Sequence, residues 1–222
     1  MTIASHEIRT PITAMKFQVQ LVQRLLKEAQ IQEASGPKLN RLTEQLNQQL
    51  FRLAHLVDGM LDVSKINGGA FTLNRSRLDL SELTCEAIER LRPHIQDKRC
   101  QLEITTDGPV WIDADPTRIE QMLTNLVMNA VRYGGGTPIA VSVDVLPSGL
   151  ARLQVRDSGN GISKPDQARI FEKFERASAE KSGLGIGLYV VRQIAHAHGG
   201  LVKVESDIGS GAIFSVDLPA LA

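Results

Sequence analysis

The stretch Ser5-His6-Glu7-Ile8-Arg9-Thr10-Pro11 begins an apolar seam that decides how the first third of the chain folds. Pro11 bends a helix one turn after His6, because it leaves the carbonyl of Glu7 without its intrahelical partner. Glu7 can accept a proton from the imidazole of His6, which makes that ring a nucleophile, and Thr10 shares its helical face. An isolated surface histidine is the plain alternative, but a costly local feature such as this proline often marks function.

The seam runs outward from this stretch through two segments. Six apolar side chains recur at alternating steps of four and three, namely Ile8, Ile12, Met15, Val19, Val22 and Leu26. A similar series runs from Leu39 to Val63, after a break at residues 34–37. This spacing is typical of a coiled coil and predicts a hairpin of two long helices. Two helices bury such a seam poorly, so we expect a homodimer that closes a four-helix bundle, with a lone hairpin as the alternative.

The periodicity changes after Asn67-Gly68-Gly69, which is C-cap chemistry. We therefore expect a helical dimerisation domain over residues 1–67 and a second domain over residues 68–222. In the second domain, helices are expected over 79–96, 115–133 and 187–198. Strands are expected over 71–78, 100–105, 110–112, 139–146, 150–156, 201–206 and 212–218. This order predicts an α/β sandwich with three main helices on a mixed sheet, so the fold class of the whole chain is α+β.

The composition excludes several classes of protein. Lys and Arg together number 25, as do Asp and Glu, so the formal charge is zero and no nucleic-acid surface is indicated. No apolar run approaches the roughly 18 residues of a membrane span. Cys85 and Cys100 lack the spacing of a metal site, which fits a cytoplasmic setting. The helix that carries His6 needs more residues before it, so we expect upstream sequence. Any attachment to a membrane would be through that upstream segment.

Three stretches of the second domain carry polar or glycine-rich patterns at the ends of helices and strands. Asn125 and Asn129 share one helical face, and an amide oxygen is a suitable ligand for Mg²⁺. The carboxylate of Asp157-Ser158-Gly159-Asn160-Gly161 can accept a hydrogen bond from an amino group, while the glycines let a ligand approach the backbone. Gly183-Leu184-Gly185-Ile186-Gly187-Leu188 leads into a helix whose N–H groups suit phosphate oxygens. Buried asparagines and an Asx turn are the structural alternatives.

Together these stretches resemble the sensor histidine kinases of two-component systems. Residues 5–11 are similar to the phosphoacceptor box Ser-His-Glu-Leu-Arg-Thr-Pro of that family, and Ile8 is the one difference. The resemblance implies that ATP phosphorylates His6 while Glu7 accepts its proton. It also implies that Thr10 places a water that removes phosphate from the aspartate of a partner. The resemblance covers nearly the whole chain and implies the ATPase fold shared by gyrase and the Hsp90 chaperones.

The same resemblance implies a nucleotide site in the second domain, with ATP and Mg²⁺ as cofactors. It assigns Asn129 to the metal and Asp157 to the adenine. The other nucleotide-binding residues that it implies are Asn125, Arg132, Tyr133, Gly159, Gly161, Arg176, Gly183, Gly185, Gly187 and Leu188. The implied partner is the receiver domain of a response regulator. Residues 170–174 resemble the phenylalanine box of the family, where aromatic packing is expected, and 177–182 resemble its lid.

Two other functions remain as alternatives. An ATP-hydrolysing clamp of the same fold carries a glutamate four residues before its metal-binding asparagine, as the base for water, whereas this chain has Asn125. A catalytically inactive dimeric scaffold would be compatible with the helices, but no motif position is visibly broken. Transfer of a phosphoryl group to His6 is therefore the preferred interpretation.

Other polar residues are predicted to have structural roles. His196 and His198 lie at a helix end before Gly199-Gly200, where a positive charge would favour the helix dipole. Gln49 is a polar residue of the seam that would fix its register. Residues 209–214 are expected to close the sheet as part of a hairpin.

Overall fold

The computed structural model describes residues 17–22, 24, 36–67, 72–96, 100–175 and 185–221. The chain divides into two compact units, an N-terminal unit built mainly from residues up to Ser64 and a C-terminal unit from Lys65 onward. Within the described residues, no helix has the length and apolar character that a membrane crossing requires.

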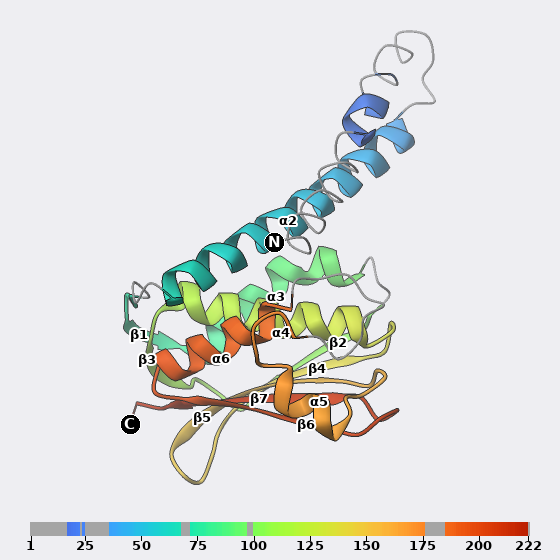
Figure 1. Ribbon diagram of the computed structural model, residues 1–222. Helices are drawn as coiled ribbons and strands as arrows, with labels where there is room; N and C mark the ends of the chain where they lie inside the picture. Colours follow the sequence, from blue (N-terminus) through green and yellow to red (C-terminus); the bar gives the residue numbers. More distant parts are fainter. Residues whose placement is uncertain are drawn as a thin grey trace. The chain divides into compact units, whose positions relative to one another are not determined.

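The N-terminal unit is helical. Its long helix α2 (Gly36–Asn67) has 32 residues, and residues 17–22 form a helical segment beside it (Figure 1). The two contact one another where Gln18 Nε2 donates a hydrogen bond to Gln45 Oε1 at 3.4 Å. The helical hairpin expected from the seam therefore agrees with the part of this unit that the structure describes.

The seam of α2 is less exposed than the stripe beside it. Its described seam residues are half-buried, namely Leu42, Leu46, Gln49, Leu53, Met60 and Val63. In contrast, Leu50, Val57 and Leu61 are 53%, 40% and 53% exposed. Val19 of the first helix, which the spacing places in the seam, is also exposed. The hairpin thus leaves apolar side chains of both helices in contact with solvent.

The C-terminal unit is built on a five-stranded sheet. Its strands are β2 (Leu102–Thr106), β4 (Ile139–Val145), β5 (Leu150–Asp157), β7 (Ala212–Pro219) and β6 (Leu201–Ser206), in that spatial order. β2 pairs with β4 in parallel and the other pairs are antiparallel, so the sheet is mixed as expected. A separate antiparallel pair is formed by β1 (Ser76–Asp79) and β3 (Trp111–Ala114).

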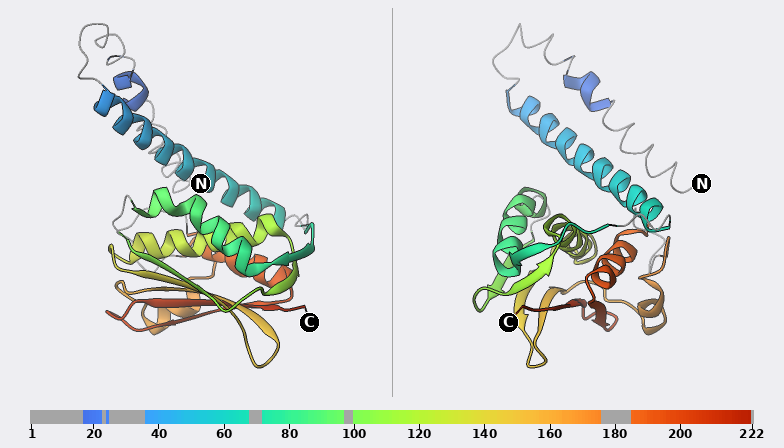
Figure 2. Two further views of the ribbon diagram at one scale, coloured as in Figure 1. Left: turned by 180° about the vertical axis from the view of Figure 1, so that it is seen from behind. Right: turned by 90° about the vertical axis from the view of Figure 1, so that its left-hand side faces the viewer.

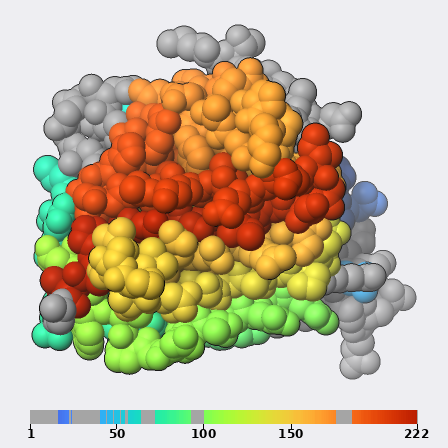
Figure 3. Space-filling view, turned by 90° about the horizontal axis from the view of Figure 1, so that it is seen from below, coloured from blue at the N-terminus to red at the C-terminus, as the bar shows by residue number. Residues whose placement is uncertain are grey.

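Three helices cover one face of this sheet, namely α3 (Leu80–Gln96), α4 (Pro116–Tyr133) and α6 (Gly187–Ala197). Figures 1 and 2 show them side by side against the strands, with α4 in contact with both α3 and α6. Alternate side chains of β5 and β7, such as Leu153 and Val216, are fully buried in the core. Figure 3 shows the opposite face of this unit from below in a space-filling view. The predicted sandwich of three main helices on a mixed sheet is confirmed.

Polar side chains define where the helices begin. Asp115 is the N-cap of α4, because its side chain accepts a hydrogen bond from the Arg118 N–H at 3.2 Å, and Pro116 follows in the first turn as predicted. Asp79 likewise accepts from the Ser81 N–H at 2.9 Å where α3 begins. A short helix, α5 (Lys164–Arg169), was not expected, since six residues without a buried side chain give no apolar periodicity.

Candidate functional site

The two asparagines of α4 lie in different surroundings although they share a helical face. Asn125 is buried, and its Nδ2 donates to the carbonyl of Gln121 at 3.1 Å. Its Oδ1 faces the start of α6, where a β-carbon on Gly187 would lie only 2.8 Å away. Asn129 is half-exposed one turn further on. Asn125 therefore packs α4 against α6, and Asn129 is the one that a ligand can reach.

The C-terminal end of α4 meets the loop after β5. A β-carbon on Gly159 would lie 2.3 Å from the carbonyl oxygen of Tyr133, so only glycine allows this close approach. A β-carbon on Gly134 would lie 3.5 Å from Cβ of Asp157. The asparagine face of α4 and the Asp157 loop, which are separate in sequence, are therefore neighbours in the fold.

Asp157 is a buried acceptor at the end of β5, with 5% of its surface exposed. The Gly159 N–H donates to Oδ1 at 2.9 Å, and the backbone of Ala212 also forms a hydrogen bond with this carboxylate. Burial raises the pKa of Asp157 above its usual value, while the two backbone hydrogen bonds oppose that rise. A hydrogen bond from a ligand amino group to this carboxylate would form in surroundings where water competes poorly.

The hairpin of β6 and β7 holds the Asp157 loop in place. The Ile162 N–H donates to Ser206 Oγ at 2.8 Å, and Ser206 Oγ donates in turn to the carbonyl of Gly211. The Gly209 N–H donates to the carbonyl of Asn160 at 2.8 Å. The structural role expected for residues 209–214 is therefore confirmed, and it includes fixing the loop that carries Gly159 and Gly161.

The aromatic residues of the segment 170–174 have different roles. Phe171 is buried and packs edge-on against Phe214, with ring centroids 6.3 Å apart. Phe174 is 57% exposed, and its backbone has a positive φ of 64°, which is unusual for a bulky residue. Its N–H donates to the carbonyl of Gly185 at 3.0 Å. Aromatic packing is thus confirmed for Phe171 and is wrong for Phe174, which brings Gly185 next to this segment instead.

The remaining site residues divide between the described and the undescribed parts of the chain. Arg132 is exposed, and Tyr133, Gly161 and Leu188 are half-exposed. His6, Glu7, Thr10, Arg176 and Gly183 lie outside the described residues. The close approaches of Gly159 to Tyr133 and of Gly187 to Asn125 bring the described site residues of both loops to the second half of α4.

The donor set of this site suits a magnesium ion that is bound together with a nucleotide. Among the residues that the structure describes, no group of three or more His, Cys, Asp or Glu side chains could hold a metal by itself. Mg²⁺ in nucleotide sites takes few protein ligands and completes its octahedron with phosphate oxygens and water. The half-exposed amide of Asn129 therefore fits as the protein ligand.

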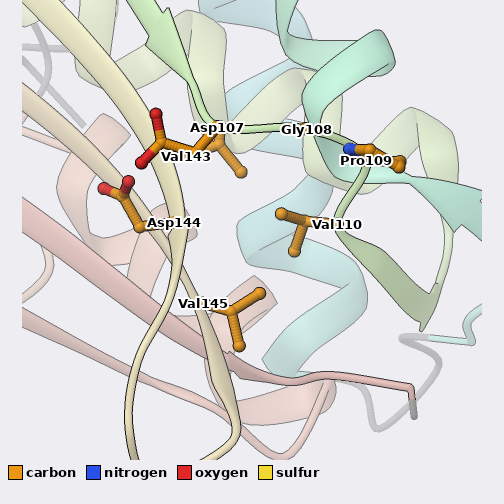
Figure 4. A pocket seen from close by; sticks show the side chains of 7 residues that line it. All are labelled: Asp107, Gly108, Pro109, Val110, Val143, Asp144 and Val145. Carbon is orange, nitrogen blue, oxygen red and sulfur yellow. The ribbon is translucent and has the colours of Figure 1, made fainter.

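A cavity of about 240 Å³ lies away from these residues (Figure 4). It is lined by Asp107, Gly108, Pro109, Val110, Val143, Asp144 and Val145. Asp157 pairs with the first residue of β4, whereas Asp144 and Val145 end that strand, so the cavity is at the opposite end of β4. Its lining offers two carboxylates and no basic side chain, which does not suit a polyphosphate.

His198 was misassigned from the sequence. It is 3% exposed, and burial lowers its pKa below the usual value, so it does not place a positive charge at the end of α6. Its position four residues after the buried Ile194, on the apolar stripe of α6, is the signal that could have predicted its burial. His196 is exposed, as a helix-end histidine would be.

Comparisons with known proteins place both units in one family. Residues 1–69 match the His Kinase A (phospho-acceptor) domain, and residues 114–222 match the family of histidine kinase-, DNA gyrase B- and HSP90-like ATPases. The sensor-like histidine kinase SenX3 of Mycolicibacterium smegmatis is 30% identical over 97% of this chain. The chain spans 55% of the length of that relative.

Solved structures agree with this match. The histidine kinase AdeS of Acinetobacter baumannii is 26% identical, with a TM-score of 0.67 over 98% of each chain. The histidine kinase ThkA, in a complex with the response regulator protein TrrA, is 26% identical, with a TM-score of 0.62 over 98% of this chain and 60% of that one. The chain therefore belongs to the histidine kinase family.

Proposed function

We propose that this chain transfers the γ-phosphoryl group of Mg-ATP to His6 and then passes it to an aspartate of a response regulator. The observation that supports the proposal most directly is the convergence of three stretches around the second half of α4. Tyr133 meets Gly159, and Asn125 meets Gly187. The loop proposed to bind adenine and the glycines proposed to bind phosphate therefore border one site. Because the reaction uses ATP, we place this part of the protein in the cytoplasm.

Different residues of the site hold different parts of the nucleotide. The buried carboxylate of Asp157 accepts from the adenine amino group, and Gly159 lets the loop approach closely. N–H groups at the start of α6, from Gly185 to Leu188, approach the phosphate oxygens together with Gly183, Arg132 and Arg176. Asn129 would hold Mg²⁺, which neutralises phosphate charge when it is bound.

His6 supplies the acceptor and Glu7 removes its proton. One ring nitrogen attacks the γ-phosphorus, the bond from that phosphorus to the bridging oxygen breaks, and ADP leaves. The proton on the other ring nitrogen passes to the carboxylate of Glu7. Thr10, four residues after His6 in the sequence, orients the water that later removes phosphate from the regulator.

The surroundings of Asn125 favour transfer over hydrolysis. A clamp ATPase needs a carboxylate base at this position, and here the side chain is a neutral amide bonded to the carbonyl of Gln121. Its oxygen faces Gly187 and so is occupied by packing against α6. Water near the γ-phosphate therefore has no base from this position of α4.

We also propose that the chain works as a homodimer. The exposed stripe of Leu50, Val57 and Leu61 lies beside the half-buried seam of α2, so one helix presents two apolar faces. A hairpin uses one face, and a four-helix bundle uses both. A second copy of the hairpin would cover this stripe. Sedimentation of the chain at twice its own mass would support this proposal, and a monomer at all concentrations would contradict it.

Incubation with radiolabelled ATP tests the proposed reaction. The parent protein should acquire a label that is stable in base and lost in acid, as a phosphoramidate is. His6→Gln should acquire no label while it binds ATP as the parent does, because acceptor and nucleotide site lie in different parts of the chain. His196→Gln is the matched control. It removes an exposed histidine that is not the proposed acceptor, so this variant should be labelled as the parent is. Persistent labelling of His6→Gln would show that another residue is the acceptor.

Phosphoryl transfer to a response regulator needs a separate measurement. The structural relative ThkA was solved with a response regulator, which supports a receiver domain as the partner here. Transfer from labelled protein to a panel of receiver domains would identify that partner. Thr10→Ala should then keep autophosphorylation and lengthen the lifetime of the regulator phosphate. Equal lifetimes would leave Thr10 with a structural role.

A further inference from the structure

Residues 72–75 are the first that the structure describes after α2, and two of them are held at the ends of α4 and α6. The Asn74 N–H donates to Oδ2 of Asp115 at 2.9 Å. Arg75 Nη2 donates to the carbonyl of Ala197 at 2.6 Å, and Nη1 lies 4.0 Å from Asp113. This incoming segment, residues 72–75, is therefore held at the start of α4 and at the end of α6.

His198 joins these contacts into one cluster. Its Nε2 accepts a hydrogen bond from the Asp115 N–H at 3.0 Å, and its Nδ1 lies 2.8 Å from the carbonyl oxygen of Ile194. An N–H can only donate and a carbonyl can only accept, so these partners require a neutral ring with its proton on Nδ1. Asp115 in turn caps α4 through Arg118 and holds Asn74. The neutral ring thus supports both the cap and the incoming segment.

This cluster lies at the start of α4 and the end of α6, whereas the candidate nucleotide site lies at the second half of α4 and the start of α6. Asp115 and Asn125 are about 15 Å apart along α4, and Gly187 and His198 about 16 Å apart along α6, at the usual rise per residue. Asn125 meets Gly187 at one end, and Asp115 meets His198 at the other. The two helices contact each other and therefore connect the incoming segment with the nucleotide residues.

Charged groups from three elements face the ring of His198. They are Arg75 of the incoming segment, Asp113 of β3 and Asp115 at the cap of α4. Burial is the largest influence and lowers the pKa of His198; Arg75 acts in the same direction, and the two carboxylates oppose it. A proton on Nε2 would place a donor opposite the Asp115 N–H. That hydrogen bond is therefore lost whenever the ring is charged.

We propose that His198 is a positioning residue for phosphoryl transfer, whose neutral ring fastens the incoming segment to the helices of the nucleotide site and whose protonation releases it. The inference rests on the proposed function, because transfer between two units depends on where the segment that joins them is held. His198 acts through Asp115, because Asp115 is the N-cap of α4 and lies away from Asn125 and the nucleotide site. ATP affinity should not depend on it.

Amide hydrogen exchange of the intact chain tests the fastening without any kinase activity. Protection factors at Asp115 and Asn74, corrected for intrinsic exchange, should fall as the pH is lowered through the pKa of His198, which is below its ordinary value of 6.5. In His198→Gln, where an amide oxygen can accept and cannot titrate, protection should stay constant. His196→Gln should behave as the parent. Constant protection in the parent at a pH where NMR shows the His198 ring to be protonated, or an equal fall in His198→Gln, would overturn the inference.

The autophosphorylation rate gives the functional test. His6 also loses reactivity when it is protonated, so the informative quantity is the rate of His198→Gln divided by the rate of the parent, in which that loss cancels. We expect this ratio to rise by about threefold or more once the pH has fallen below the pKa of His198, with ATP affinity equal in both proteins. A flat ratio would contradict the inference. A parent that never labels would contradict the proposed function instead, and hydrogen exchange would still decide the role of His198.

Discussion

Arg152 and Asp217 form a two-pronged ion pair across β5 and β7, with Nε to Oδ1 at 2.7 Å and Nη2 to Oδ2 at 2.9 Å. They are directly opposite one another in the sheet. The carboxylate is 4% exposed and the guanidinium 27%, so water screens the pair only partly. Removing Arg152 would therefore leave a buried charge with Lys203, 3.9 Å away, as its remaining cation among the described residues.

We expect Arg152→Ala to lower the free energy of unfolding by about 2 kcal/mol, the usual contribution of hydrogen bonds to a charged group. Arg152→Lys should lower the free energy of unfolding by part of that amount, because the ammonium group of lysine cannot form both hydrogen bonds of the guanidinium. Urea titration of the chain measures both. Arg156→Ala is the control and should change stability little, because Arg156 lies four residues after Arg152 on β5 and is exposed. Equal effects at Arg152 and Arg156 would show that the ion pair contributes nothing.

The same pair predicts how stability depends on pH. The hydrogen bond from Arg152 is the main reason that the pKa of Asp217 lies below its ordinary value of 3.8. The folded state therefore binds this proton less readily than the unfolded state, so the stabilisation is complete above pH 3.8 and is lost as the pH falls through the lowered pKa. Acid titration of Asp217→Asn should lack this component.

ATP binding should depend on the charge of Asp157. Asp157→Asn replaces an acceptor with a group that can present a donor to the adenine amino group, and we expect affinity to fall by about 1.5–3 kcal/mol. Isothermal calorimetry measures this loss. Asp107→Asn, in the cavity at the other end of β4, is the control and should bind as the parent does. If Asp107→Asn weakens binding instead, the site has been assigned to the wrong end of the sheet.

The pKa of Asp157 gives that affinity a pH dependence. Burial raises this pKa, so the carboxylate is protonated, and ATP affinity declines, at a higher pH than for an ordinary aspartate. For the unliganded protein the sign of the stability effect is the reverse of that for Asp217. The folded state holds this proton more tightly than the unfolded state, so this contribution to stability is lost as the pH rises through the raised pKa.

Phe171 and Phe174 should respond oppositely to truncation. Phe171→Ala removes a buried ring that packs on Phe214 and should cost about 3–5 kcal/mol of stability. Phe174→Gly removes an exposed ring and relieves a positive φ, so it should leave stability unchanged or raise it by about 1 kcal/mol. Thermal unfolding of the two variants compares them directly. Equal losses would mean that the Phe174 ring is packed in solution.

Thr84→Val should stabilise the C-terminal unit. Thr84 is fully buried on α3, and its Oγ1 finds no hydrogen-bond partner among the described residues. Valine has the same shape without the hydroxyl, so the substitution should add about 1 kcal/mol to the free energy of unfolding. Thr105→Val, at an exposed position of β2, is the control and should have little effect. A loss of stability in Thr84→Val would indicate that a bound water satisfies the hydroxyl.

Much of the site was predictable because its parts are local patterns. The Asp115-Pro116 cap, the paired asparagines of α4 and the acceptor at Asp157 each lie within a few residues of sequence. What the sequence could not provide is which of these parts touch. The contact of Gly159 with Tyr133 and the contact of Asn125 with Gly187 arise from tertiary packing.

The errors have a common physical origin. His198 was interpreted from its place at a helix end, but the turn that follows brings it against Asp115, more than 80 residues earlier. Phe174 was interpreted from its apolar ring, whereas its backbone conformation, set by a hydrogen bond to Gly185, turns that ring outward. In both cases a backbone contact with a residue more than ten positions away overrode a local preference. At α5 the origin is local instead, because capping by Ser163 formed a helix without any apolar periodicity.

The place of β7 within the sheet has a consequence for how this protein is made. β7 follows every other strand along the chain, yet it lies between β5 and β6, and it pairs residues as far apart as Arg152 and Asp217. Such pairing closes a long loop and forms late. On a translating ribosome the sheet therefore has a gap at an inner position until β7 emerges. Ala212 reaches Asp157 only then, so the buried carboxylate of Asp157 obtains this backbone hydrogen bond after the other strands have been synthesised.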